Sequence, residues 1–278
     1  MVLVTACQSW RPATVRPRRL IPEGEPGTAS QVLESFPYEL DPWLDGALTA
    51  GGLALFSVAE ALRRAQKPLT KDDIKALDRS NVNGFDRPAT AQWSPTAHDV
   101  SDGQILALVT APLVLAITTP GSRQSLTVAA MYGEALLVAN GLGELLNGVT
   151  KRTRPFAYNG DPNIPPKPLS EVDARRSFPS GHTTNAFTAA VFLSSVFAKL
   201  YPGSSARPRM WAGSLTLAVA TGSMRYQAGK HFPTDIFSGA VLGSLVGWGV
   251  PKLHEVDGVD LTVAPSGGGI NIGLMLSH

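Results

Sequence analysis

Three short strings of polar residues in the second half of the chain have the residue types that phosphate chemistry needs. They are Lys151–Phe156, Ser177–His182 and Arg225–Asp235. An arginine can hold a phosphate through two parallel N–H bonds. A histidine can attack phosphorus or move a proton, and a carboxylate can orient the imidazole. Each string alone is also compatible with a surface arginine, a helix cap or a surface ion pair, so the argument depends on their combination.

The first two strings each adjoin a helix end. Pro155 should end the preceding helix and place Arg154 at its terminus, because the residue before a proline avoids the α region. Ser180 can cap the next helix or point its hydroxyl outward, and Gly181 lets a ligand approach the backbone. His182 projects from the same turn, where free N–H groups attract an anion. The arrangement predicts a phosphate cradle.

The third string sets His231 four residues before Asp235. On a helix this spacing puts both side chains on one face, so the carboxylate could hold one ring N–H and leave the other nitrogen free to attack. His182 could join them as zinc ligands. The two neighbouring arginines would repel a dication and attract an anion, and this disfavours a metal.

Taken together, the strings resemble the type 2 phosphatidic acid phosphatase and vanadium haloperoxidase superfamily. Its pattern is Lys-x6-Arg-Pro, Pro-Ser-Gly-His and Ser-Arg-x5-His-x3-Asp, and the resemblance covers about residues 43–253. It implies a core of about six helices and metal-free phosphoryl transfer.

The resemblance also implies a role for each residue. His231 would form a phosphohistidine, Asp235 would orient it, and His182 would protonate the leaving alcohol. The phosphate oxygens would be held by Arg154, Ser180, Gly181 and Arg225.

Two positions depart from the pattern. Asn147 stands where the pattern has lysine, and Met224 where it has serine. If the helix continues toward Pro155, Lys151 lies one turn beyond Asn147 on the same face. We therefore expect Lys151 to bind the phosphate in place of the missing lysine, or else to point to solvent.

Six apolar segments predict an all-α, six-helix bundle with few strands. They are Trp43–Leu62, Gln104–Thr119, Ser125–Thr153, Thr183–Leu200, Met210–Met224 and Asp235–Leu253. Their charge-free runs fall short of the ~20 residues that a membrane span needs, which favours a soluble or tethered bundle over spans. The segment Val259–Leu276 alternates weakly and suggests a hairpin or an extended arm.

Composition narrows the function classes. The 278 residues are 44% hydrophobic, only 17% are charged, and the net charge of +2 argues against a nucleic-acid protein. The single cysteine, Cys7, follows Val4-Thr5-Ala6 as in a bacterial lipoprotein box, although only six residues precede it. We expect lipidation at Cys7, a basic proline-rich tail over 1–35, a helical catalytic domain over 36–255 and an extended tail over 256–278.

The sequence therefore predicts a phosphatase without a cofactor that hydrolyses phosphate monoesters or pyrophosphates of lipids through a phosphohistidine. It would act on the periplasmic side of a bacterial envelope, held by a lipid anchor or by its helices. One alternative is a haloperoxidase with vanadate in the same cradle. The other is a protein that binds phosphate headgroups without turnover.

Overall fold

The computed structural model describes residue 32 and residues 36–256, 259–266 and 269–276. The predictions for Cys7 and for the basic linker that follows it lie outside these residues.

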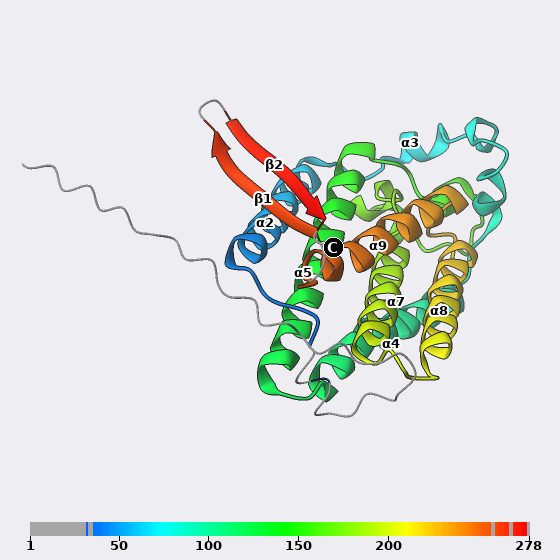
Figure 1. Cartoon of the computed structure of the whole chain (residues 1–278). Helices are drawn as coiled ribbons and strands as arrows, with labels where there is room; N and C mark the ends of the chain where they lie inside the picture. Colours follow the sequence, from blue (N-terminus) through cyan, green and yellow to red (C-terminus); the bar gives the residue numbers. More distant parts are fainter. Residues whose placement is uncertain (1–31, 33–35, 257–258, 267–268, 277–278) are drawn as a thin grey trace, which may run out of the picture.

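Six helices of at least 20 residues dominate the described chain, and the all-α class is confirmed (Figure 1). They are α2 (Pro42–Ala65), α4 (Pro95–Thr118), α5 (Ser122–Thr150), α7 (Gly181–Leu200), α8 (Arg207–Gln227) and α9 (Pro233–Leu253). Shorter helices lie between them, α3 (Lys71–Lys75) and α6 (Pro166–Leu169) among them, so the count of six applies only to the long ones. Strands β1 (Val259–Ser266) and β2 (Gly269–Leu276) pair antiparallel, so the C-terminal segment forms the hairpin.

Capping residues explain where the helices begin. Asp41 accepts hydrogen bonds from the first N–H groups of α2, and Ser94 accepts one from the Ala97 N–H of α4. A proline occupies the first helical position in both cases, where its missing N–H costs nothing. The Ser94 cap makes α4 begin nine residues before the predicted Gln104, so the helix also contains polar residues that precede the predicted apolar segment.

Helix α7 lies at the centre of the bundle and contacts α4, α5, α8 and α9. Its closest neighbour is α9, which meets it through glycines at four-residue intervals. A Cβ atom at Gly239, Gly243 or Gly247 would lie 2.8, 2.2 or 2.5 Å from the carbonyl oxygens of Ser180, Thr184 and Thr188 respectively. Such small-residue contacts let two helix backbones approach closely. They fix the register of α7 on α9 and so bring the beginnings of both helices together.

Three helices are long and apolar enough to cross a membrane: α4, the α5 segment and α9. Only 28% of the apolar window of α4 and 33% of that of α9 is buried within the protein. Large apolar side chains on these helices face outward, including Leu106, Ile117, Phe237, Leu245 and Trp248. The expectation that these helices are buried is therefore not met for α4 and α9, which expose much of their apolar surface. Counting charge-free runs underestimated their lengths, because the polar first turns also belong to the helices.

Candidate active site

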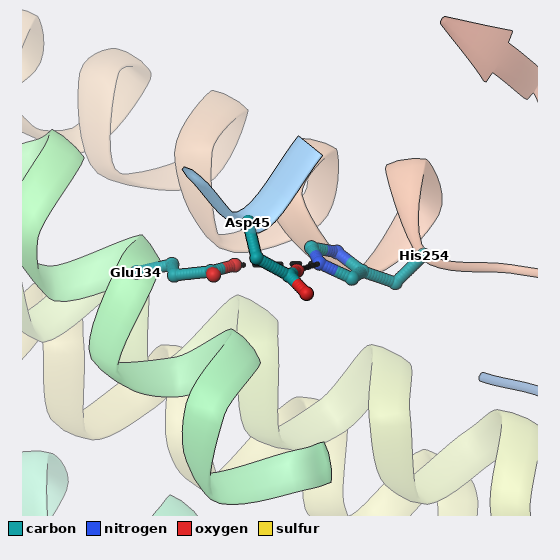
Figure 2. Close-up of side chains that lie close together, drawn as sticks. All are labelled: Asp45, Glu134 and His254. Atoms are coloured by element: carbon teal, nitrogen blue, oxygen red, sulfur yellow. Dashed lines mark hydrogen bonds and ion pairs between the residues drawn. The ribbon is translucent and has the colours of Figure 1, made fainter. Parts of the chain in front are cut away.

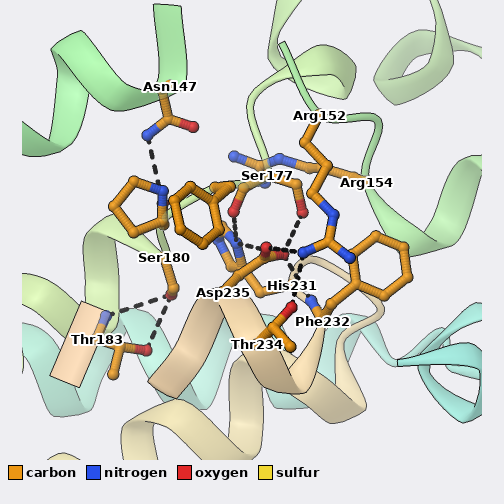
Figure 3. A network of polar contacts seen from close by, with 12 residues as sticks. Asn147, Arg152, Arg154, Ser177, Ser180, Thr183, His231, Phe232, Thr234 and Asp235 are labelled. Atoms are coloured by element: carbon orange, nitrogen blue, oxygen red, sulfur yellow. Dashed lines mark hydrogen bonds and ion pairs between the residues drawn. The ribbon is translucent and has the colours of Figure 1, made fainter. Parts of the chain in front are cut away.

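The predicted polar residues gather where α7 and α9 begin and where α5 and α8 end (Figure 3). They surround a cavity of about 360 Å³. Its lining includes Asn147, Arg154, Gly181, His182, Arg225, Lys230 and His231, together with His98 and Asp173. Residues from all three strings, which are separated in the sequence, thus meet at one cavity.

His231 lies in the loop before α9 and is only 2% exposed. Its Nδ1 atom is 2.8 Å from the carbonyl oxygen of Ser177. A carbonyl can only accept, so Nδ1 carries the hydrogen and Nε2 keeps its lone pair. Burial, followed by the charges of Arg154 and Arg225, holds the pKa of His231 well below its usual value of 6.5. The ring is therefore neutral at physiological pH, with a nucleophilic nitrogen available.

Asp235 does not hold the His231 ring directly, which corrects the expected pairing. Its Oδ2 atom is 4.0 Å from His231 Nδ1 and instead accepts hydrogen bonds from the Ser177 hydroxyl at 2.6 Å and the Phe232 N–H at 2.8 Å. The spacing argument assumed one helical face, but α9 begins at Pro233, after the histidine. Asp235 therefore acts through Ser177, whose main-chain carbonyl orients the imidazole.

Arg152 is a structural residue that sequence reasoning missed. Its Nη1 atom donates to Asp235 at 2.5 Å and to the Thr234 hydroxyl at 2.7 Å, and its Nη2 atom donates to Asp86 at 2.7 Å. The guanidinium also lies 4.1 Å from the centre of the Phe232 ring. Arg152 thus ties the start of α9 to the loop that contains Asp86, and the forked geometry suits arginine rather than lysine.

Two buried arginines give the cavity its positive charge. Arg154 donates from Nη2 to Asp173 at 3.0 Å, and Arg225 donates from Nη1 to His98 Nδ1 at 2.8 Å and to the Ser101 hydroxyl at 3.1 Å. The Nε atom of each arginine is buried without a hydrogen-bond partner among the described residues. Buried donors without a partner are costly, and an anion would satisfy both.

The beginning of α7 contributes Gly181 and His182 to the cavity, whereas Ser180 is not part of its lining. The Ser180 hydroxyl oxygen accepts from the Thr183 N–H and the Thr183 hydroxyl, so it serves as the helix cap, and its role as a phosphate ligand stays a prediction. His182 Nε2 is 2.8 Å from a side-chain oxygen of Asp102, which lies in α4 just before the predicted apolar segment. Burial and then the charge of Arg225 lower the pKa of His182 to about 4.

Lys151 does not replace the missing lysine. Helix α5 ends at Thr150, and Lys151 takes a left-handed conformation with φ of 48° and is exposed outside the cavity lining. The prediction that it shares a helical face with Asn147 is therefore wrong, because the chain leaves the helix before reaching it. Asn147 is buried in the cavity wall, where its amide donates to the carbonyl oxygens of Gly143 and Pro179.

Lys230 is the cation that sequence reasoning overlooked. It lines the cavity, and its ammonium lies 5.1 and 5.6 Å from the ring centres of Phe156 and Trp93. Burial, followed by the charges of Arg154 and Arg225, lowers its pKa to about 8. The sequence signal was its position directly before His231, within a spacer that the motif leaves unspecified.

The sequence of part of the chain is similar to that of known proteins. Residues 128–257 match the PAP2 superfamily. The chain is 35% identical over 126 residues to the bacitracin transport permease protein BcrC of Bacillus licheniformis, covering 44% of this chain and 55% of that protein. It is 32% identical over 104 residues to a lipid A 4'-phosphatase of Bacteroides thetaiotaomicron, covering 34% and 42%. The matches span about half the length of these curated relatives, or less.

A solved structure is also similar. It is that of a transmembrane PAP2 type phosphatidylglycerolphosphate phosphatase from Bacillus subtilis, with 24% identity, a TM-score of 0.39 and coverage of 72% of this chain and 93% of that one. The family match over residues 128–257 and the curated relatives confirm the resemblance that the motifs carried: this part of the chain is similar to the PAP2 superfamily.

Proposed function

We propose that this protein is a phosphatase that removes phosphate from lipid phosphate monoesters or pyrophosphates through a phosphohistidine at His231. One arrangement carries the proposal. A neutral imidazole, with its Nδ1–H held by the Ser177 carbonyl, lines the same cavity as Arg154 and Arg225, whose buried Nε–H groups lack partners. A phosphoryl group would accept from both arginines while its phosphorus faces the free nitrogen. Phosphoryl transfer needs mainly such positioning and charge stabilisation.

In the first step, the Nε2 lone pair of His231 attacks phosphorus and the bond from phosphorus to the alcohol oxygen breaks. His182 gives that oxygen a proton, so the alcohol leaves neutral. In the second step, water attacks the phosphohistidine, His182 takes back a proton, and phosphate leaves with His231 regenerated. Protonated His182 is scarce in the empty cavity, but a bound phosphate dianion raises its pKa because it favours the charged form.

Lys230 takes the part of the lysine that Asn147 replaces. Burial and then the charges of Arg154 and Arg225 lower its pKa, and phosphate binding would relieve this repulsion. With the two arginines it gives the cavity three cationic side chains. We infer that they supply the charge stabilisation of the transferring group, so that the reaction takes place without a metal ion.

The lipid part of the substrate is inferred from the surroundings of the cavity. A second cavity of about 360 Å³ adjoins the first and shares His98, Glu171, Asp173 and Lys230 with it. Its lining also includes Trp93, Phe156 and three prolines. The outward-facing apolar side chains of α4 and α9 suit a membrane. The related lipid A 4'-phosphatase acts, by its name, on a lipid phosphate. We place the protein in the bacterial envelope with its cavity on the periplasmic side, with lipidation at Cys7 as an additional anchor to be tested by mass spectrometry.

A phosphate-release assay on the detergent-solubilised full chain tests the proposal. The substrates would be a phosphatidic acid, a prenyl pyrophosphate and a soluble aryl phosphate, each with wild type, His231→Gln and the exposed control Lys151→Ala. We expect lipid substrates to be hydrolysed faster than the soluble one by wild type and control alike. Phosphate binding without release would instead support a headgroup binder, and peroxide-dependent bromination with vanadate and no phosphate release would support a haloperoxidase.

A further inference from the structure

A second cluster of titratable side chains lies at the other end of α9 (Figure 2). It joins Asp45 in the first turn of α2, Glu134 in α5 and His254 directly after α9. One ligand atom from each residue lies within 4.8 Å of the other two. The 19 residues from Asp235 to His254 correspond to about 28 Å of helix, so this cluster is separate from the phosphate cavity.

The hydrogen bond on the far side of the His254 ring fixes its tautomer. Its Nδ1 atom is 2.8 Å from the Val250 carbonyl oxygen, so Nδ1 carries the hydrogen. Its Nε2 atom faces Asp45 Oδ1 at 2.8 Å and Glu134 Oε2 at 3.3 Å. If the ring is neutral, its Nε2 lone pair and those of the two carboxylate oxygens converge on one point. This arrangement needs a proton or a metal cation between the three atoms.

The hydrogen bonds of Glu134 leave one of its oxygens unsatisfied. Its side chain is 8% exposed, and its Oε2 atom is buried with no hydrogen-bond partner among the described residues. In the part of the chain that the structure describes, no lysine or arginine forms an ion pair with Asp45 or Glu134; the nearby Lys199 and Lys252 pair with Glu255. When both carboxyl groups are deprotonated and the imidazole is neutral, the cluster carries a charge of −2, which one divalent cation would balance.

We propose that Asp45, Glu134 and His254 bind a divalent transition-metal ion, with zinc as the best-fitting type. One imidazole nitrogen and two carboxylate oxygens match the nitrogen and oxygen ligands of zinc, and a water would complete four-coordination. The Nδ1–H bond to the Val250 carbonyl is the outer contact that metal-bound histidines usually make. The 23% exposed side chain of Asp45 offers a path of entry. The ion would join α2 to α5 and to the end of α9, and so stabilise the bundle without taking part in phosphoryl transfer.

Metal binding to the untagged full chain in detergent tests the site. The protein is stripped with a chelator, exposed to Zn²⁺ or Mn²⁺ and desalted, and then its metal content and Tm are measured. We expect about one zinc per wild-type chain and a Tm that rises by several degrees on addition of zinc. Both effects should be lost in Glu134→Gln and His254→Gln and kept in the matched control Glu255→Gln.

Asp45→Asn provides a second test if the buried variants fail to fold, because Asp45 lies at the accessible edge. It should fold and bind zinc at least tenfold more weakly than wild type. The proposal is overturned if stripped wild type retains no zinc and its Tm does not respond, which would mean that a proton shared among the three groups is what holds the cluster together. It is equally overturned if His254→Gln retains as much zinc as wild type.

Discussion

Helix α9 has a buried histidine just beyond each end, and the two differ in the sign of the charges around them. His231 and His254 both donate Nδ1–H to a main-chain carbonyl oxygen, so both turn Nε2 toward a polar cluster. The largest charges acting on His231 are those of Arg154 and Arg225, although Asp235 lies 4.0 Å from its Nδ1 atom, whereas the charged neighbours of His254 are carboxylates. The same local geometry thus prepares one ring to meet an anion and the other to meet a cation.

Atoms that lack partners show the same contrast. At the phosphate cavity they include two charged donors, the Nε atoms of Arg154 and Arg225, besides the neutral amide oxygen of Asn147. At the end of α9 the Glu134 Oε2 atom is an acceptor. Because a buried polar atom without a partner destabilises the fold, each set indicates the charge of the ligand that would complete it. The comparison teaches that the sign of the charges around a buried histidine, more than the histidine itself, decides its function.

We expect the largest effect from the substitution that removes the nucleophile. His231→Gln should lower kcat/KM for a lipid phosphate by at least about 10³-fold, because the amide cannot form the covalent intermediate. Inorganic phosphate should still bind, since both arginines remain, and a binding titration checks this. If His231→Gln retains a tenth of the wild-type rate, the nucleophile lies elsewhere.

The next effect concerns the support of the His231 loop. Arg152→Met removes one partner of two buried carboxylates, Asp86 and Asp235, which should cost about 3–5 kcal/mol in the free energy of unfolding. Thermal and denaturant unfolding measure the loss, with the exposed control Arg123→Met unchanged. A loss below about 1 kcal/mol would show that water replaces the guanidinium and that the network does not hold the loop.

We expect a smaller effect from the loss of Lys230, the third cationic side chain of the cavity. Lys230→Met should lower kcat/KM by about 10- to 100-fold, and Lys151→Met should leave it unchanged. The pH profile separates charge from packing. The pKa of Lys230 is about 8, so wild-type kcat/KM should fall as pH rises through 8 and the ammonium loses its proton, whereas Lys230→Arg should remain flat to pH 9. An unaltered profile in Lys230→Arg would rule out this role.

The smallest effect concerns the close contact between Gly243 in α9 and the first turns of α7. A Cβ at position 243 would lie 2.2 Å from the Thr184 carbonyl oxygen, so Gly243→Ala should destabilise the protein by about 1–3 kcal/mol. Gly249 has open space around it, and Gly249→Ala should be neutral or slightly stabilising. Equal changes in Tm for both variants would show that the close approach does not fix the two helices.

The sequence predicted the long helices and the meeting of the three strings well, because apolar periodicity and motif order are local signals. It failed wherever a helix boundary decided the outcome. Lys151 was assigned to a helical face that ends one residue earlier, and His231 to a helix that begins two residues later. Helix ends depend on caps and tertiary contacts, such as the hydrogen bond of Ser94, that spacing alone does not reveal.

Residues contributed by distant segments were also beyond the reach of the sequence. Asp86 and Asp102 lie in a polar stretch with no motif, and they reach Arg152 and His182 only through the packing of α4 and the preceding loop. Arg152 was given no role in the sequence analysis, since nothing local distinguishes it from Arg154. The cluster of Asp45, Glu134 and His254 joins three segments more than 80 residues apart, so no spacing pattern could indicate it.

The central claim is that the neutral imidazole of His231 becomes the carrier of the phosphoryl group. Its most direct test is rapid alkaline quenching of the wild-type chain during turnover of a lipid phosphate labelled in the phosphate, followed by mass spectrometry of the peptide that contains His231. The account predicts one acid-labile phosphate on His231, formed and lost at rates compatible with turnover and missing from His231→Gln. Turnover of wild type with no phosphorylated histidine, or with the phosphate on His182, would contradict it.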